Sequence, residues 1–264
     1  MMRKLTALGL MAGMLTMPAL AQKKIEYKEF DLDNGLHVIM HQDNTTPIVI
    51  TSVLYHVGSK NEQPDRTGFA HFFEHLMFEG SPNLDRGEYA NIIEARGGTL
   101  NAFTSNDITY YYELLPSNEL ELALYLESER MLQSKVDQIG VDTQREVVKE
   151  EYRQRYDNQP YGTLLLETLK RSFSEHPYNW APIGSLDHLN AAAIEEFQQF
   201  YKDFYVPNNA TLTIAGDIDY AQTEEWVREY FSEIPKGAKD IYRPNVVEPK
   251  KTTEIRDIIY DNIQ

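Results

Sequence analysis

Three ionisable side chains, His71, Glu74 and His75, lie within a strongly apolar segment, "GFAHFFEHLMFEG". At about 100° per residue its apolar residues surround the helix axis, a pattern typical of a helix buried on all sides. The same spacing places the three ionisable groups on one narrow face. Two His four residues apart can bind one zinc ion, and the carboxylate beside the second His can then deprotonate a bound water. This is the HxxEH arrangement, the inverse of the HExxH zinc motif.

The structural alternative is a buried His pair whose ring nitrogens are satisfied by backbone groups and by Glu74. Buried ionisable groups cost several kcal/mol unless they are paired, hydrogen-bonded or bound to a metal. Both interpretations meet that requirement, so the motif needs support from a further ligand elsewhere in the chain.

A zinc ion held by two His requires at least one more protein ligand, which in a chain without cysteine must be His, Asp or Glu. The segment "TQREVVKEEYRQRYDN" supplies a candidate. Helical periodicity with Val147 and Val148 facing inward places Glu151 on the inward face and Glu150 outside it. Glu151 is the expected ligand, and Glu150 is the reserve if the helix begins differently. The alternative role for Glu151 is an ion pair with Arg155, four residues later.

Hydrophobic periodicity and turn residues predict an α+β fold with an antiparallel sheet packed against a layer of helices. A hairpin is expected around Asn34 and Gly35, within 26–43, because Asn-Gly is a strong turn signal. The other expected elements are strands over 47–58, 99–116 (two) and 209–217, and helices over 68–80, 86–98, 117–174 (a helical block), 191–205 and 221–234. Residues 176–185 are expected to form a loop.

The composition describes a globular chain of 264 residues with 42% hydrophobic residues and a net charge of −16. An acidic protein repels nucleic acid and anionic lipid, so neither is expected as a partner. A neutral or basic substrate is favoured weakly. Because the chain has no cysteine, its stability must come from the core or in part from a metal.

The first 21 residues are typical of a secretory signal peptide, with a basic start at Arg3 and Lys4, an apolar middle, and Ala19 and Ala21 at a small-residue cleavage site. A membrane anchor is the alternative, but Gly9, Gly13 and Pro18 break the apolar run, and a span needs about 20 continuous apolar residues. We expect an exported protein, periplasmic first and secreted as the alternative, without stable membrane insertion once the signal is removed.

The domain organisation expected after the signal is one catalytic domain over 24–236 followed by a linker and an incomplete second domain over 237–264. "PKGAKDIYRPNVVEPKKT" is rich in Pro and Lys, as linkers often are. "TEIRDIIYDNIQ" resembles a first strand of a further domain.

From about Lys24 to Gln264 the chain strongly resembles the pitrilysin family of zinc metallopeptidases, which includes insulin-degrading enzyme and the mitochondrial processing peptidase. "GFAHFFEHLMFEGS" resembles the active-site helix of that family and "VVKEE" the helix with its distal Glu ligand. "GGTLNAFTSNDITYYYE" and "NNATLTIAGDID" are similar to two further family blocks. The resemblance implies that His71, His75 and Glu151 bind zinc and that Glu74 is the general base.

The resemblance also implies a substrate site and shows one departure. "TLNAFTS" would be the edge strand to which a peptide adds by backbone pairing, along Asn101, Ala102 and Phe103, although an ordinary edge strand is the alternative. Many family members have a second Glu seven residues before the ligand Glu, and here that position is Gln144. The sequence therefore does not decide which charged groups surround the metal ligands.

The expected function is zinc-dependent endopeptidase activity on peptides or unfolded polypeptides, in which Glu74 takes a proton from a water and returns it to the leaving amine. Family members resemble a clamshell of two homologous halves, so the expected partners are a peptide substrate and a second half, in the same longer chain or a separate subunit. The rival is a catalytically silent, peptide-binding or assembly subunit. The remaining histidines are expected to be structural or exposed: His37, His41, His56, His176 and His188.

Overall fold

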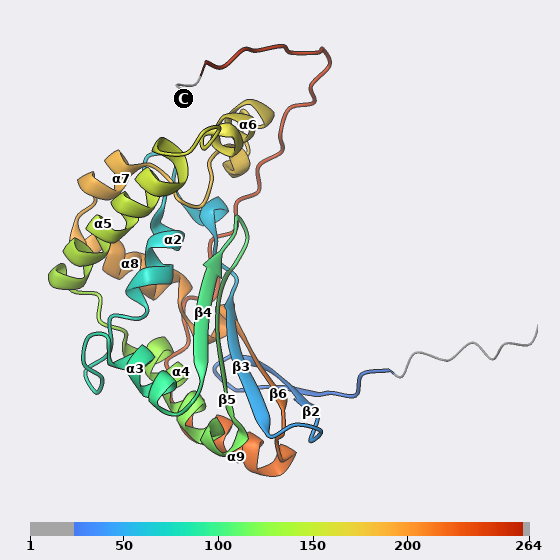
Figure 1. The fold of residues 1–264 in the computed structure, drawn as a ribbon. Coiled ribbons are helices and arrows are strands. Elements are labelled where there is room, and N and C mark those ends of the chain that lie inside the picture. Colours follow the sequence, from blue (N-terminus) through green and yellow to red (C-terminus); the bar gives the residue numbers. More distant parts are fainter. Residues whose placement is uncertain (1–23, 261–264) are drawn as a thin grey trace, which may run out of the picture.

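The computed structural model describes residues 24–260, and its centre is a six-stranded sheet with the order β1-β2-β6-β3-β5-β4 (Figure 1). All neighbouring strands are antiparallel except β2 and β6, which are parallel. The α+β prediction is confirmed, with one parallel pair that the sequence did not indicate. The strands are β1 Lys28–Asp31, β2 His37–Gln42, β3 Ile48–Tyr55, β4 Thr99–Thr104, β5 Thr109–Pro116 and β6 Ala210–Gly216.

The predicted hairpin joins β1 to β2 through a turn in which Gly35 adopts φ +88°, a conformation that favours glycine. The Asn34 amide of the same turn donates to the carbonyl oxygens of Phe231 (2.7 Å) and Ile234 (3.1 Å). The turn is thereby attached to the end of the last described helix. The final carbonyl groups of a helix have no partner within the helix, and the Asn34 amide supplies a donor there.

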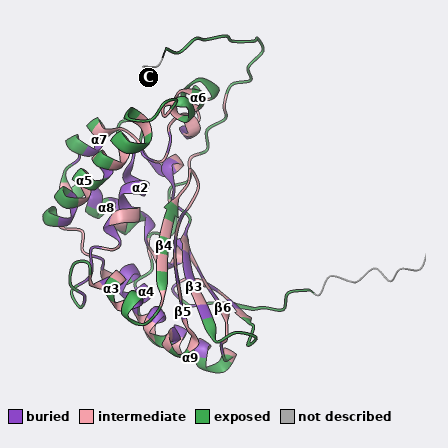
Figure 2. Cartoon of the chain, in the orientation of Figure 1, coloured by how far each residue is buried: buried purple, intermediate pink, exposed green. Residues whose placement is uncertain are grey.

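Helices cover one side of the sheet, where the buried residues concentrate (Figures 1 and 2). They are α2 Phe69–Leu76, α3 Glu88–Ala95, α4 Leu120–Gln133, α5 Gln138–Tyr152, α6 Leu164–Ser172, α7 Leu186–Ala191, α8 Ile194–Phe204 and α9 Tyr220–Phe231. Helix α7 was not predicted, and a π-helical turn, Arg153–Asp157, follows α5. The loop expected over 176–185 contains a short 3-10 turn, Pro177–Asn179.

Helix α2 is fixed by aromatic side chains from α8. The Phe69 ring stacks on Phe197 with ring centres 4.6 Å apart, and Phe73 stacks on Phe200 at 5.5 Å and on Tyr205 at 5.0 Å. Pairs at this spacing add to the free energy gained from burial alone. The prediction of a buried helix agrees with this packing, since its apolar side chains contact core residues on several sides.

A second group of ionisable side chains is enclosed between α3, α4 and β5, and we call it the Arg130 network. Arg130 pairs with Glu127 at 2.7 Å and with Glu113 at 3.6 Å, and Tyr89 donates to Glu113 at 2.6 Å. The Arg130 Cζ lies 4.3 Å from the Tyr89 ring centre and 4.5 Å from that of Tyr111. Burial raises the pKa of Glu127 well above its usual range, although the Arg130 charge opposes the shift.

Residues 237–260 form neither helix nor strand. The strand-like segment expected from 253 onward is therefore not paired within the described residues. The predicted division between a domain over 24–236 and a second one remains a prediction. The expected signal peptide lies outside the described residues. Over 24–260, no helix combines the length and apolar character that crossing a membrane requires.

Candidate metal centre

Helix α2 begins at a buried carboxylate. Glu62 accepts hydrogen bonds from the backbone amides of Gly68 (2.9 Å) and Ala70 (2.8 Å) and from the Trp180 indole (3.1 Å). The first amides of a helix have no partner within it, so this carboxylate substitutes for a capping side chain. Burial raises the pKa of Glu62 to about 8, although these three donors oppose the shift. The start of the histidine-bearing helix is therefore fixed from outside it.

His71, His75 and Glu151 converge on one point. The Nε2 atoms of His71 and His75 lie 3.5 Å and 3.3 Å from the same oxygen, Oε2 of Glu151. Ligand atoms of a tetrahedral zinc lie about 3.4 Å apart, since each is about 2.1 Å from the metal. Within the described part of the chain, this is the one group of three or more His, Asp or Glu residues whose ligand atoms come so close, all within 4.8 Å of one another. The donor set therefore fits zinc.

Glu151, and not Glu150, faces the histidines. Glu150 is turned toward solvent, where it pairs with Arg153 at 3.4 Å and accepts from Gln154 at 3.0 Å. Arg155 contacts Oε1 of Glu151 at 3.0 Å and leaves Oε2 to the histidines, so the alternative ion pair coexists with the cluster. Burial raises the pKa of Glu151, but contacts with His71, His75 and Arg155 outweigh it and lower the pKa well below its usual range.

The inward face of α5 differs in one respect from the prediction. Val147 was expected to face inward but is 45% exposed, whereas Val141 and Val148 are fully buried. The buried face is rotated away from Val147 because α5 packs on α2 through its Gln144 and Glu151 side. Glu151 remains on that face, so the error in Val147 did not change the choice of carboxylate.

Glu74 lies on the same helix as the histidines and is held by a residue that the sequence did not single out. The Thr104 hydroxyl, at the end of β4, donates to Oε2 of Glu74 at 2.7 Å. This bond fixes one carboxylate oxygen and leaves the other available. The only sequence signal is position, because Thr104 lies in the expected substrate strand, directly after Phe103.

Strand β4 is an edge of the sheet, since it pairs with β5 alone among the described strands. Asn101 and Phe103 are exposed on it and Ala102 is half-buried. The Asn101 side chain accepts from the Ala102 amide at 2.8 Å, which occupies one backbone donor of the edge. The free edge runs beside α2, so the expected substrate strand and the metal cluster are neighbours.

Gln144 does not contact the metal cluster. Its amide donates to Oε1 of Glu79 at 2.5 Å, and Glu79 also pairs with Arg86. The side chain of Glu79 is 5% exposed. A carboxylate is thus present beside position 144, but the segment just after α2 provides it.

The other histidines lie apart from the cluster. His37 contacts Asp31 at 2.8 Å, His41 the carbonyl of Glu26 at 2.6 Å, and His188 the hydroxyl of Thr67 at 2.9 Å. His176 accepts from the Tyr178 amide at 3.2 Å, and His56 is exposed. None of the five belongs to the cluster of three ligands.

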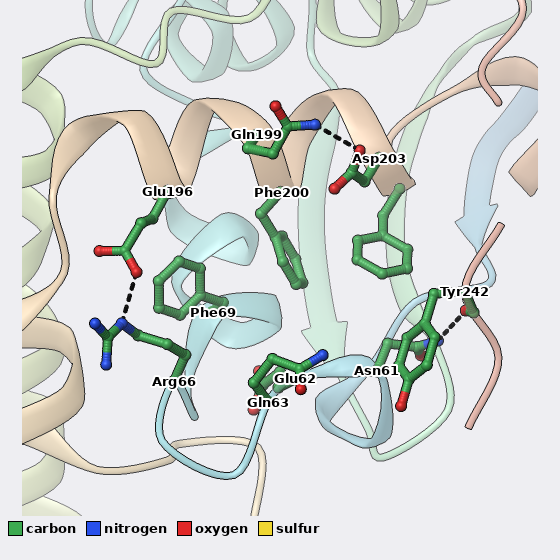
Figure 3. Close-up of a pocket in the computed structure, with 11 residues that line it drawn as sticks. Asn61, Glu62, Gln63, Arg66, Phe69, Glu196, Gln199, Phe200, Asp203 and Tyr242 are labelled. Carbon is green, nitrogen blue, oxygen red and sulfur yellow. Dashed lines mark hydrogen bonds and ion pairs between the residues drawn. The ribbon is translucent and has the colours of Figure 1, made fainter. Parts of the chain in front are cut away.

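A pocket of about 300 Å³ lies beside the start of α2 and is also lined by side chains of α8 (Figure 3). Phe69 and Phe200 form its apolar wall, and Arg66 pairs with Glu196 across its edge at 2.6 Å. Asn61 donates to the carbonyl of Tyr242 at 3.1 Å, which ties the segment after α9 to the rim. None of the three candidate metal ligands, His71, His75 and Glu151, lines this pocket.

The fold and the candidate site, in which two histidines of an inverted motif meet one glutamate, are those expected of a metallopeptidase. Residues 37–179 match the model of insulinase, peptidase family M16, and the chain belongs to this family. Residues 192–263 match a second model, the peptidase M16 inactive domain. His71, Glu74, His75 and Glu151 all fall within the first match.

The relatives carry zinc-protease names. The chain is 34% identical over 228 residues to "Zinc protease PqqE" of Helicobacter pylori, covering 86% of this chain and 51% of the relative. It is 29% identical over 259 residues to "Probable zinc protease PqqL" of Escherichia coli, covering 92% of this chain and 27% of the relative. Apart from the longer PqqL, the chain spans about half the length of the curated relatives it matches.

Solved structures show the same fold. A protease from Helicobacter pylori superimposes with a TM-score of 0.83 at 33% identity, covering 86% of this chain and 55% of that one. The first half of the periplasmic protease PqqL from Escherichia coli superimposes with a TM-score of 0.75 at 26% identity, covering 85% of this chain and 49% of that one.

Proposed function

We propose that this chain is the metal-bearing part of a zinc-dependent endopeptidase that acts on peptides or unfolded polypeptides. The observation that carries the proposal is the approach of two imidazole nitrogens to one carboxylate oxygen at 3.3 and 3.5 Å. Such a set of acceptors from two helices suits a divalent cation, and its ligand types suit zinc. Family membership supports the same chemistry.

In the proposed mechanism His71, His75 and Glu151 hold the zinc ion. When bound, zinc supplies Lewis acidity, which lowers the pKa of water and polarises a peptide carbonyl. Glu74 takes the proton of the attacking water on the carboxylate oxygen that Thr104 leaves free, and then delivers it to the nitrogen of the leaving amine. The Thr104 hydroxyl keeps the carboxylate in one orientation during both transfers.

The substrate in this proposal is an extended peptide. It pairs with the free edge of β4 through backbone groups of Asn101, Ala102 and Phe103, so that main-chain hydrogen bonds give affinity without requiring a particular sequence. The exposed Phe103 ring, with 46% of its area accessible, offers an apolar contact to one substrate side chain.

The proposal includes a second, homologous half and export. The chain covers about half of the relative from Helicobacter pylori, and the PqqL structure that it matches is a first half, which supports a partner half in a longer chain or separate subunit. The N-terminal signal pattern and the periplasmic location of PqqL support a periplasmic protein. Cleavage by the purified chain, measured with and without its second half, tests the requirement; full turnover by a monomer contradicts it.

The decisive experiment compares Glu151→Gln with Glu150→Gln. Zinc content and cleavage of an unfolded peptide are measured for both variants and the unaltered chain. We expect the Glu151→Gln protein to lose zinc and activity, because one of three ligands is removed, and the Glu150→Gln protein to keep both. Zinc binding without cleavage, in the presence of the second half, would instead favour the catalytically silent subunit.

A further inference from the structure

Helices α2 and α5 meet at two separate places. The first is the metal cluster, where Glu151 faces both histidines. The second is the bond from Gln144 on α5 to Glu79, just beyond the end of α2. Gln144 and Glu151 are seven residues apart, about two helical turns, and so share one face of α5. A helix held at two points on one face cannot rotate or slide without breaking one of them.

The second contact is built from buried polar groups. Glu79 is 4% exposed, and its second oxygen pairs with Arg86. Arg86 also pairs with Asp137 at 3.1 Å, and Asp137 caps the start of α5 through the Gly140 amide at 2.7 Å. These contacts join the segment after α2 to the first turn of α5 by a continuous chain of charged and polar groups.

The absence of a side chain at Gly140 makes room for this arrangement. A Cβ there would lie 2.9 Å from the Arg86 guanidinium and 3.4 Å from Oε2 of Glu79. Both partners of the ion pair therefore pass directly over the backbone of α5, and position 144 must meet the remaining oxygen of a buried carboxylate. That oxygen requires a hydrogen-bond donor, which Gln supplies and an ionised Glu does not.

We propose that Glu79 and Gln144 are positioning residues that hold α5 in register with α2, so that Glu151 reaches the point where the two histidines converge. This inference rests on the proposed metal site and adds a role for residues outside it. The buried negative charge stands on Glu79, just after α2, and position 144 serves as its donor. A Glu at position 144, the residue found there in many family members, would instead place two carboxyl groups against each other in this chain.

The test reverses the hydrogen bond. In Gln144→Glu two carboxylates face each other, and we expect zinc affinity, measured by competition with a chromogenic chelator, to fall about 10-fold or more. In the double variant Glu79→Gln with Gln144→Glu, the amide and the carboxylate exchange places, and most of the affinity should return. The thermal midpoint of the metal-free protein should fall in the single variant and recover in the double one.

The matched control is Gln138→Glu. Gln138 lies on the same helix and also donates to a carboxylate, Asp142 at 2.9 Å, but the pair is exposed. Solvent screens that repulsion, so zinc affinity should not change.

Three results would overturn the inference: unchanged zinc affinity in Gln144→Glu, a lower midpoint with unchanged affinity, or a double variant that does not recover in affinity or in folding. An unaltered chain that binds no zinc would instead overturn the proposed function and this inference with it.

Discussion

The metal cluster and the Arg130 network both bury carboxylates beside nitrogen groups, but they are closed to different degrees. In the network the side chains of Arg130, Glu113 and Glu127 are at most 1% exposed. In the cluster the exposed fractions are 8% for His71, 23% for His75 and 17% for Glu151. The Arg130 network is closed to solvent, whereas the metal cluster is open to solvent on one side.

The Arg130 network and the metal cluster also differ in their hydrogen bonding. In the network, donors are directed at the carboxylates: Arg130 at Glu127, and Thr51 and Tyr89 at Glu113. In the cluster, nitrogen and oxygen atoms that can act as acceptors converge on one another. The Arg130 network is a closed group of ion pairs and is suited to stabilising the fold. The metal cluster is a partly exposed group of converging acceptor atoms and is suited to binding a cation and a substrate. The comparison predicts separate effects on stability and on chemistry.

The largest effect is expected for Arg130→Leu. Removing the guanidinium leaves Glu113 and Glu127 buried without their cation, and such losses cost about 3–5 kcal/mol. Urea unfolding of the metal-free protein measures this.

The penalty of Arg130→Leu should also depend on pH. A carboxyl whose pKa is higher in the folded than in the unfolded state contributes stability that is present at low pH and lost as pH rises through the folded pKa. Burial already raises the pKa of Glu127, and loss of Arg130 raises it further. The destabilisation should therefore grow as the pH rises; a penalty independent of pH would contradict this account of the network.

Glu74→Gln should reduce turnover by about 100-fold or more, equivalent to about 2.7 kcal/mol, because the amide keeps the shape of the carboxylate but cannot accept a proton. Zinc content should stay near that of the unaltered chain. His71→Ala is the comparison, since it should lose both metal and activity. Turnover of Glu74→Gln close to the unaltered level would remove Glu74 from the mechanism.

Added zinc should separate the two sites directly. At a free concentration 100 times its Kd, a ligand that binds only the folded state raises the free energy of unfolding by about 2.7 kcal/mol. We expect this increment in the unaltered chain and in any folded Arg130→Leu protein, but not in Glu151→Gln. Loss of the increment in Arg130→Leu would show that the two sites are coupled.

The smallest effect is expected for Thr104→Val, which removes the hydroxyl that fixes Glu74. Because the cluster has an open side, water can replace the donor, and the loss should be on the order of 1 kcal/mol, or about fivefold in kcat. Thr104→Ser should restore turnover while thermal midpoints stay similar. If Thr104→Ser is as slow as Thr104→Val, packing and not the hydroxyl is responsible.

The sequence was most informative where chemistry depends on spacing within one element. His71 and His75 are four residues apart on one helix, so their convergence follows from helix geometry. Glu151 could be chosen over Glu150 by the face it occupies on α5. The Asn34 turn likewise depends on local backbone preference.

Features that depend on contacts between distant segments were missed. The parallel pairing of β6 with β2 joins residues that are far apart in the chain, and periodicity carries no information about the partner. The Arg130 network and the bond from Thr104 to Glu74 were missed for the same reason. Gln144 is visible in the sequence as a departure from the Glu that many family members have there, but its partner Glu79 is apparent only in the folded chain.

The position of β6 also sets an order of events during folding. This strand, Ala210–Gly216, is the last of the described strands, yet it fills the place between β2 and β3. While a ribosome is still producing the segment before it, β2 and β3 cannot obtain their shared neighbour, and the aromatic support that α8 gives to α2 is also missing until about residue 205. Closing such long-range contacts slows folding. All four residues of the proposed catalytic centre are therefore synthesised well before the framework that holds them, and the centre can be completed only after β6 has been made.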